Sequence, residues 1–265
     1  LEKDIHSSQD FSKIQGRFNT RLSLSSANAD EVIKKRLLEK NDTGKDAVQL
    51  LYTGEVQASL RNKINFSDGK ITKKKYDSLK NFSEFYPMIP YQLDLLQQVF
   101  TKIRENSSAG KHFASGERNL LGAVQYAALE YAEKNLGILV PFQTFYGHLD
   151  QGLDHSVRAT IIKAQSTPTL QSFDVDVLKV LYLIRYLKSV PSTVENITTL
   201  MLDELDADRL KLTEDITAAL DRLTKEYLVQ RTGLEYLFLT NEEQDINREI
   251  NHMDIPTSKM QSYIG

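Results

Sequence analysis

Apolar side chains recur at helical spacing along most of this chain, and this pattern limits its fold more than any other feature. Within 92–105, for example, Leu96, Phe100 and Ile103 follow one another at intervals of four and three positions. Only six Pro and 12 Gly interrupt the 265 residues, so helix-breaking positions are few. We therefore expect a mainly α fold, with helices over about 29–39, 46–64, 92–105, 117–135, 141–164 (one or two helices), 174–188, 194–202 and 213–227.

The last third of the chain combines three of these helices with one short β-hairpin. The hairpin strands flank Thr232 and Gly233, which supply the turn. Thr213 is expected to be the N-cap of the third helix, because acidic residues follow it in the first turn. Three helices followed by a hairpin are typical of a winged helix, which we place at 170–240, with a C-terminal helix and tail over 241–265.

The polar stretch 165–169, which contains Pro168, is the best candidate for a domain linker, because it breaks the helical pattern. The helical segment before it is expected to form a domain of its own. Near the start of the chain, residues 21–24 alternate between polar and apolar as one short strand does. A lone strand is not stable by itself, so this strand needs a partner sheet.

Charge is distributed unevenly along the chain, although the total is only −3. Residues 1–80 carry 16 Lys and Arg against 11 Asp and Glu, whereas residues 174–265 carry 10 against 17. A nucleic-acid surface would therefore belong to the N-terminal part, because the acidic C-terminal part repels phosphate. A solvated loop is the simpler interpretation of the lysine cluster that could contact DNA, which includes Lys70, Lys73, Lys74 and Lys75.

The third helix of the expected winged helix has the wrong charge for DNA. Over 213–227 it carries four carboxylates and two cationic side chains, a net charge of −2. A helix that enters the major groove needs a positive surface to approach the phosphates. The winged helix is therefore interpreted as a protein-docking or structural module rather than a duplex-binding one.

Several classes of chemistry lack their residues in this sequence. The chain contains no Cys, which excludes disulfides, iron–sulfur clusters, thiolate zinc sites and cysteine nucleophiles. Its three Gly-Lys pairs are followed by Asp46, Ile71 and His112 rather than by Ser or Thr, so it has no phosphate-binding loop. The five His show no metal-binding spacing, and Gly-x-Ser-x-Gly is absent. No apolar run approaches the roughly 20 residues that span a bilayer, and we expect a cytoplasmic protein with no metal site and no membrane contact.

Two motifs resemble those of AAA+ ATPases. The stretch 16–24 is similar to the end of their second region of homology, where a Gly-Arg-Phe-Asp-type segment precedes the last strand of the nucleotide domain. The stretch 115–121 is similar to the start of the lid helix that carries the sensor-2 arginine. A winged helix after such a lid occurs in the origin-recognition and STAND branches. The resemblance implies that 1–25 ends a nucleotide-binding domain and that 26–165 is an enlarged helical lid.

The whole length resembles more closely the C-terminal part of the BrxC/PglY family, the large P-loop ATPases of the bacterial BREX phage-defence system. Four stretches carry this resemblance and together span nearly the whole chain: 17–27, 86–92, 110–118 and 238–250. The resemblance implies a fragment of a longer protein, whose Walker A and Walker B elements precede residue 1. It also implies that the parent binds ATP and Mg²⁺, whereas the fragment itself binds neither and does not hydrolyse ATP.

The same resemblance implies roles for three arginines. Arg17, with Arg21 as the second choice, is the catalytic finger that reaches the γ-phosphate of a neighbouring subunit. Arg118 contacts the β- and γ-phosphates of the nucleotide in its own subunit. An arginine finger stabilises the charge that spreads over the phosphoryl oxygens and contributes about 10³–10⁵ in rate. From the residues alone, Arg17 could equally cap the strand, and Arg118 could pair with Glu117 or Glu130.

The resemblance also implies partners. The parent is expected to self-associate and to assemble with a PglZ-type phosphatase-like protein, a PglX-type adenine methyltransferase and DNA. One competing hypothesis is a non-enzymatic adaptor that binds DNA through residues 60–80 or docks protein through its winged helix. Binding to DNA would then depend steeply on salt concentration. Another hypothesis is a purely structural oligomerisation segment.

Overall fold

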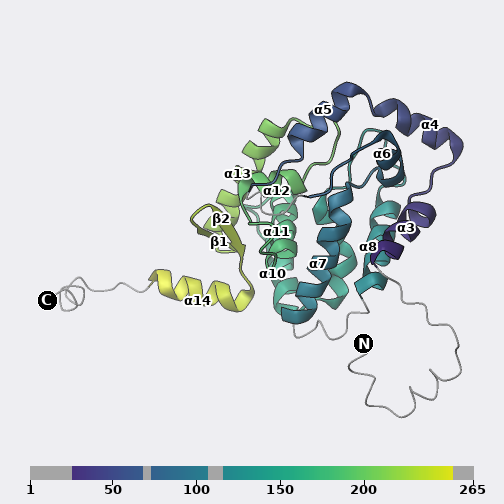
Figure 1. Cartoon of the computed structure of the whole chain (residues 1–265). Coiled ribbons are helices and arrows are strands. Elements are labelled where there is room, and N and C mark those ends of the chain that lie inside the picture. Colours follow the sequence, from purple (N-terminus) through teal and green to yellow (C-terminus); the bar gives the residue numbers. More distant parts are fainter. Residues whose placement is uncertain (1–25, 68–72, 107–115, 253–265) are drawn as a thin grey trace, which may run out of the picture.

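The computed structural model describes residues 26–67, 73–106 and 116–252. Within these ranges the chain forms twelve α-helices and one antiparallel β-hairpin near the C-terminus (Figure 1), so the expected mainly α fold is confirmed. None of the helices in this described part is both long enough and apolar enough to cross a membrane. The same three ranges contain no group of three His, Cys, Asp or Glu side chains that could hold a metal ion.

Two short helices replace the single helix expected over 46–64, and that expectation is wrong. The chain leaves the helical conformation at Tyr52 and resumes it after Thr53, whose hydroxyl oxygen accepts a hydrogen bond from the Val56 amide at 3.3 Å. Thr53 favours a helix start, because its side chain satisfies an amide that has no partner within the helix. The first helices are α3 (Ser26–Val32), which continues as a π-helical turn (Ile33–Leu37), α4 (Asp42–Leu51), α5 (Gly54–Lys63) and α6 (Leu79–Phe85).

Two long helices, α7 (Pro90–Asn106) and α8 (Gly116–Glu130), form the centre of the helical body. α7 begins at a proline, whose fixed φ suits the first helical position. The side-chain amide of Gln92 is buried. Its oxygen accepts a hydrogen bond from the backbone amide of Ile89 at 2.9 Å, and its nitrogen donates one to the Val140 carbonyl at 2.7 Å. These bonds fix α7 against the segment that leads to the next helices. The next helices are α9 (Phe145–Leu149) and α10 (His155–Ser166). Short 3-10 turns lie at Phe142–Thr144 and Asp150–Gly152.

The C-terminal part contains three helices and a hairpin in the expected order, but the third helix begins earlier than predicted. It starts at Arg209, and Asp208 rather than Thr213 is its N-cap, so that prediction is wrong. Oδ1 of Asp208 accepts hydrogen bonds from the amides of Leu210 at 3.0 Å and Lys211 at 3.2 Å. A carboxylate at this position also interacts favourably with the helix dipole. The elements are α11 (Ser172–Ile184), α12 (Val194–Leu200), α13 (Arg209–Lys225), β1 (Val229–Thr232), β2 (Glu235–Phe238) and α14 (Asn241–His252).

The three helices and the hairpin pack against one another. α13 contacts both α11 and α12, while β1 lies against α13 and β2 against α11. Thr232 pairs with Glu235, so the turn residues are Gly233 and Leu234, one position later than predicted. Gly233 has a φ of +63°, which glycine adopts at little cost. After the hairpin, α14 begins against α10 and then extends away from the helical body (Figure 1).

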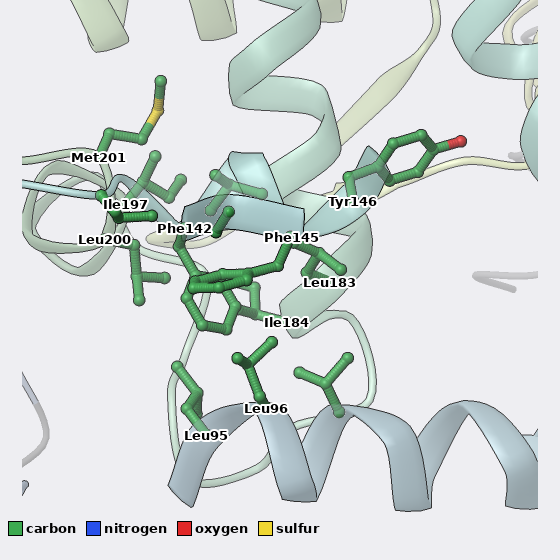
Figure 2. Packing of buried hydrophobic residues seen from close by; sticks show 14 of the residues in the cluster. Leu95, Leu96, Phe142, Phe145, Tyr146, Leu183, Ile184, Ile197, Leu200 and Met201 are labelled. Atoms are coloured by element: carbon green, nitrogen blue, oxygen red, sulfur yellow. The ribbon is translucent and has the colours of Figure 1, made fainter. Parts of the chain in front are cut away.

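One hydrophobic core joins the helices before and after the expected linker at 165–169. Figure 2 shows its centre, where the rings of Phe142 and Phe145 lie between side chains of α7, α11 and α12. Both rings are fully buried and meet edge to face, with centroids 5.5 Å apart. The side chains labelled around them are Leu95, Leu96, Tyr146, Leu183, Ile184, Ile197, Leu200 and Met201.

Candidate functional site

Of the three arginines expected to contact phosphate, only Arg118 belongs to a described helix. It lies in the first turn of α8, and its side chain is not part of the description. Arg17 and Arg21 lie outside the described residues. The helix that follows them, α3, begins at Ser26 and packs against α8. The structure therefore places the helix after the Arg17 and Arg21 segment beside the helix that carries Arg118 (Figure 1).

α8 is embedded among its neighbours. It contacts α3, the π-helical turn, α7 and α9, and its Leu120, Val124 and Ala127 side chains are completely buried. The first turn of α8 is therefore attached to a helix whose position is fixed by packing.

α8 and α9 cross at two glycines, and each glycine is covered by an aromatic ring from the other helix. The His148 ring of α9 lies over Gly122 of α8, where an added Cβ would be 2.5 Å from its Cε1 atom. The Tyr126 ring of α8 lies over Gly147 of α9, where an added Cβ would be 2.6 Å from Cζ. Burial lowers the pKa of His148, so its imidazole is neutral at pH 7. This reciprocal contact fixes the crossing of the two helices.

The lysine cluster expected near residue 70 is partly engaged with the protein itself. Lys70 lies outside the described residues. The ammonium of Lys73 is buried without a hydrogen-bond partner among the described residues, and burial lowers its pKa. Lys74 pairs with a carboxylate of α7 at 3.0 Å, and Lys75 donates to the Arg61 carbonyl at 3.3 Å. Of the three described lysines, only Lys74 has an exposed side chain.

Both arginines of α13 are directed toward the protein. Nε and Nη2 of Arg222 donate to the two carboxylate oxygens of the fully buried Asp174, at 2.7 and 2.6 Å. Arg209 donates to the carbonyls of Lys63 and Glu195. Because α13 begins earlier than the predicted helix, it also includes Arg209 and Lys211. Its exposed face is nevertheless negative. That face carries Glu214, Asp215 and Asp221 against Lys211 and Lys225.

Among the grooves of the described part, two are lined by several charged side chains of both signs. One, of about 1240 Å³, lies between α7 and the α11–α12 connection and mixes the cations of Lys102, Arg185 and Lys188 with the carboxylates of Asp94 and Glu235. Another, of about 700 Å³, lies between the first helices and α6 and is lined by five lysines and four carboxylates. Neither groove presents a field of one sign, so neither is a plain polyanion channel.

Sequence analysis missed one residue of the second groove, Lys40. Burial lowers its pKa to about 8. No motif surrounds this lysine in the sequence, and its burial depends on packing between segments. Only the structure therefore distinguishes it from the 32 other Lys and Arg residues.

No protein-family model matches this chain. No solved structure matches it either. Its function is therefore argued from the packing of its elements, from its charges and from the resemblance of its motifs.

Proposed function

We propose that this chain is the lid and winged-helix part of an AAA+-type ATPase, similar to the BrxC/PglY family of BREX phage defence. The observation that carries the proposal is the order and packing of the C-terminal elements behind a helical body that contains the α8 helix. Three helices, a hairpin and a preceding helical bundle are the elements that such a lid and winged helix require. The domains proposed are the lid over 26–165, the winged helix over 170–240 and the C-terminal segment over 241–265.

A backbone bond between the hairpin and the α11–α12 connection supports the winged-helix assignment. The Tyr236 amide of β2 donates to the Ser192 carbonyl at 3.0 Å. In a winged helix, the chain between the first two helices pairs in this way with the second strand of the hairpin. Tyr236 is also buried, so this pairing lies against the domain interior.

The lid assignment rests on the position of Arg118 in the first turn of α8. In the proposed parent protein, ATP and Mg²⁺ bind to a segment before residue 1, and Arg118 contacts the β- and γ-phosphates of the same subunit. Arg17, or Arg21 in its place, supplies the finger to a neighbouring subunit. Positive charge at these places stabilises the phosphoryl oxygens as the transferred group separates. Because α8 is embedded in the bundle, contact between Arg118 and nucleotide would couple the nucleotide state to the position of the bundle.

The exposed face of α13 favours protein partners for the winged helix. Both of its arginines donate to other groups of the described chain, and three carboxylates face solvent against two lysines. Duplex DNA would be repelled by such a face. The proposed partners are therefore proteins such as the PglZ-type and PglX-type components, with self-association of the parent. DNA contact through Lys74 and its neighbours is the weaker alternative.

A second candidate function is a docking adaptor without an ATPase role, and the same acidic face of α13 supports it. The two functions differ in what Arg118 does. ATP hydrolysis by the longer parent protein, wild type against Arg118→Ala, separates them. We expect at least a hundredfold loss of turnover, because the loss of one such contact to the transition state lowers the rate by a factor of about 10²–10³ or more.

Arg104→Ala is the matched control, because Arg104 is an exposed arginine near the end of α7. It should hydrolyse ATP as wild type does. A mixture of Arg17→Ala with a variant defective at the nucleotide site should regain part of the activity, since one subunit would supply the finger and the other the site. Wild-type turnover by both Arg118→Ala and Arg17→Ala would mean that these two arginines take no part in ATP hydrolysis, and it would favour the docking adaptor as the function of this segment.

A further inference from the structure

Lys40 lies between the π-helical turn and α4, in the groove of about 700 Å³. Figure 1 shows the helices around this groove, α3, α4 and α6, gathered on one side of the molecule. The half-buried Lys40 side chain packs beside Gly44, where an added Cβ would be 3.4 Å from the Lys40 Cβ. Its ammonium donates to the Leu38 carbonyl at 2.7 Å. The side chain is therefore held in a defined position rather than extended into solvent.

Lys40 differs from the other lysines of the groove because no carboxylate in the described part of the chain pairs with it. Each of the other four has a carboxylate oxygen within 4 Å. Lys34 and Lys80 pair with Glu84, Lys35 with Glu31 and Lys45 with Asp42. The charged groups that line the groove together with Lys40 are Asp30, Glu31, Lys34, Lys35, Glu39, Lys45, Lys80 and Glu84.

This environment favours the neutral amine of Lys40. Burial disfavours the ammonium form, and no charged neighbour opposes this effect, so the pKa of Lys40 is lowered from 10.5 to about 8. At pH 7.4, about a fifth of such amines are neutral, against about 0.1 % for an ordinary lysine. Only the neutral amine has the lone pair that a nucleophile needs.

We propose that Lys40 is an acylation site whose amine reacts with an acyl phosphate. The nitrogen attacks the carbonyl carbon, a C–N bond forms, and the C–O bond to the phosphate breaks. The electron pair of that bond leaves with the phosphate, which takes up the proton lost by the nitrogen. The products are an amide of Lys40 and hydrogenphosphate, so no further reactant is needed.

Acylation is compatible with the local structure. The amide nitrogen keeps one N–H, which can still donate to the Leu38 carbonyl. The reaction also removes a half-buried positive charge, and burying a neutral amide costs less than burying a charge. The modified chain is therefore expected to stay folded, so that modification changes the surface of the groove without unfolding it.

The test is acetylation of the full chain with acetyl phosphate, followed by peptide mass spectrometry, at pH values from 6.5 to 10.5. Lys45 is the internal control, because it lies in the same groove and has a carboxylate partner. At pH 7.4 we expect Lys40 to react about tenfold faster than Lys45. The advantage is smaller than the difference in neutral fraction, because a weaker base is also a weaker nucleophile.

The pH profile gives a second, independent readout. The rate at Lys40 should level off above about pH 9, whereas an ordinary lysine continues to gain reactivity up to about pH 10.5. Lys40→Arg should remove that acetyl group from the peptide map, and Lys45→Arg should leave the rate at Lys40 unchanged. Equal or slower reaction at Lys40 at pH 7.4 overturns the proposal, as does a rate that rises in parallel with that of Lys45 to pH 10.5.

Discussion

Asp174 is a fully buried carboxylate that connects the start of α11 to α13. It accepts two hydrogen bonds from Arg222 and a third from the Gln171 amide at 2.9 Å. A buried charge is tolerated only when its oxygens are satisfied in this way. At the scale of single residues, this pair fixes two of the three helices beneath the hairpin.

Replacing Asp174 by Asn should lower the free energy of unfolding by about 3 kcal/mol, because it removes the charge that Arg222 faces. Arg222→Met should cost more, since it leaves the completely buried carboxylate without a cation. Both are measured by urea unfolding at neutral pH. Asp176→Asn is the control, because its partner Lys179 is one helical turn away and partly exposed, and it should cost about 0.5 kcal/mol or less. Equal losses for Asp174→Asn and Asp176→Asn would refute the role of the buried pair.

Single residues also show where sequence reasoning ends. The cluster at 73–75 was visible as three consecutive lysines, but their different surroundings were not. The ammonium of Lys73 is buried, the side chain of Lys74 is exposed, and Lys75 donates to a carbonyl. Lys40 was not singled out at all. Burial and pairing arise from segments far apart in the chain, so a local pattern of residue types does not contain them.

At the scale of elements, helix cores were easier to predict than helix ends. The periodicity located the helices near α7, α11 and α12, because apolar spacing reflects the face that each helix buries. The start of α13 was misplaced, since both Asp208 and Thr213 are good capping residues and the sequence does not say which one is used. The break at Thr53 was missed for a different reason: the apolar spacing continues across it.

The crossing of α8 and α9 leads to a prediction at this scale. Gly122→Ala should destabilise the protein by about 1–3 kcal/mol, because its Cβ would meet the half-buried His148 ring at 2.5 Å. Gly147→Ala should cost less, since the Tyr126 side chain that it meets is 40 % exposed and can turn into solvent. Thermal unfolding should therefore rank wild type as the most stable protein, Gly147→Ala as the next and Gly122→Ala as the least stable.

Gly54→Ala is the control for these two substitutions. An added Cβ at Gly54 meets no atom within 4 Å, and Ala favours a helix over Gly. This variant should be as stable as wild type or slightly more stable. If Gly122→Ala were as stable as Gly54→Ala, the His148 ring would not hold the two helices at a fixed crossing.

At the scale of the whole molecule, the sequence was sufficient for the fold class and for the three helices and hairpin at the C-terminus. It did not show that the core is continuous, because 165–169 looks like a linker between two domains. The rings of Phe142 and Phe145 fill the space between helices on both sides of that stretch (Figure 2). Local composition marks where a chain is flexible in principle, whereas tertiary packing decides whether the two sides are separate. For the proposed site, the motifs indicated both Arg118 and its helix, and the structure adds the neighbours of that helix.

The continuous core predicts that the helices before and after 165–169 unfold together. Phe145→Ala should cost about 3–5 kcal/mol, as large-to-small changes of buried aromatic residues do. In one cooperative unit, the amides of α7 and α11 lose the same free energy of protection against hydrogen exchange, because both are exposed only by global unfolding. Leu129→Ala is the control, since that side chain is 69 % exposed and its removal should leave both helices protected. If Phe145→Ala reduced protection in α7 but not in α11, the two parts would fold independently, and the lid could then move relative to the winged helix without disturbing the core.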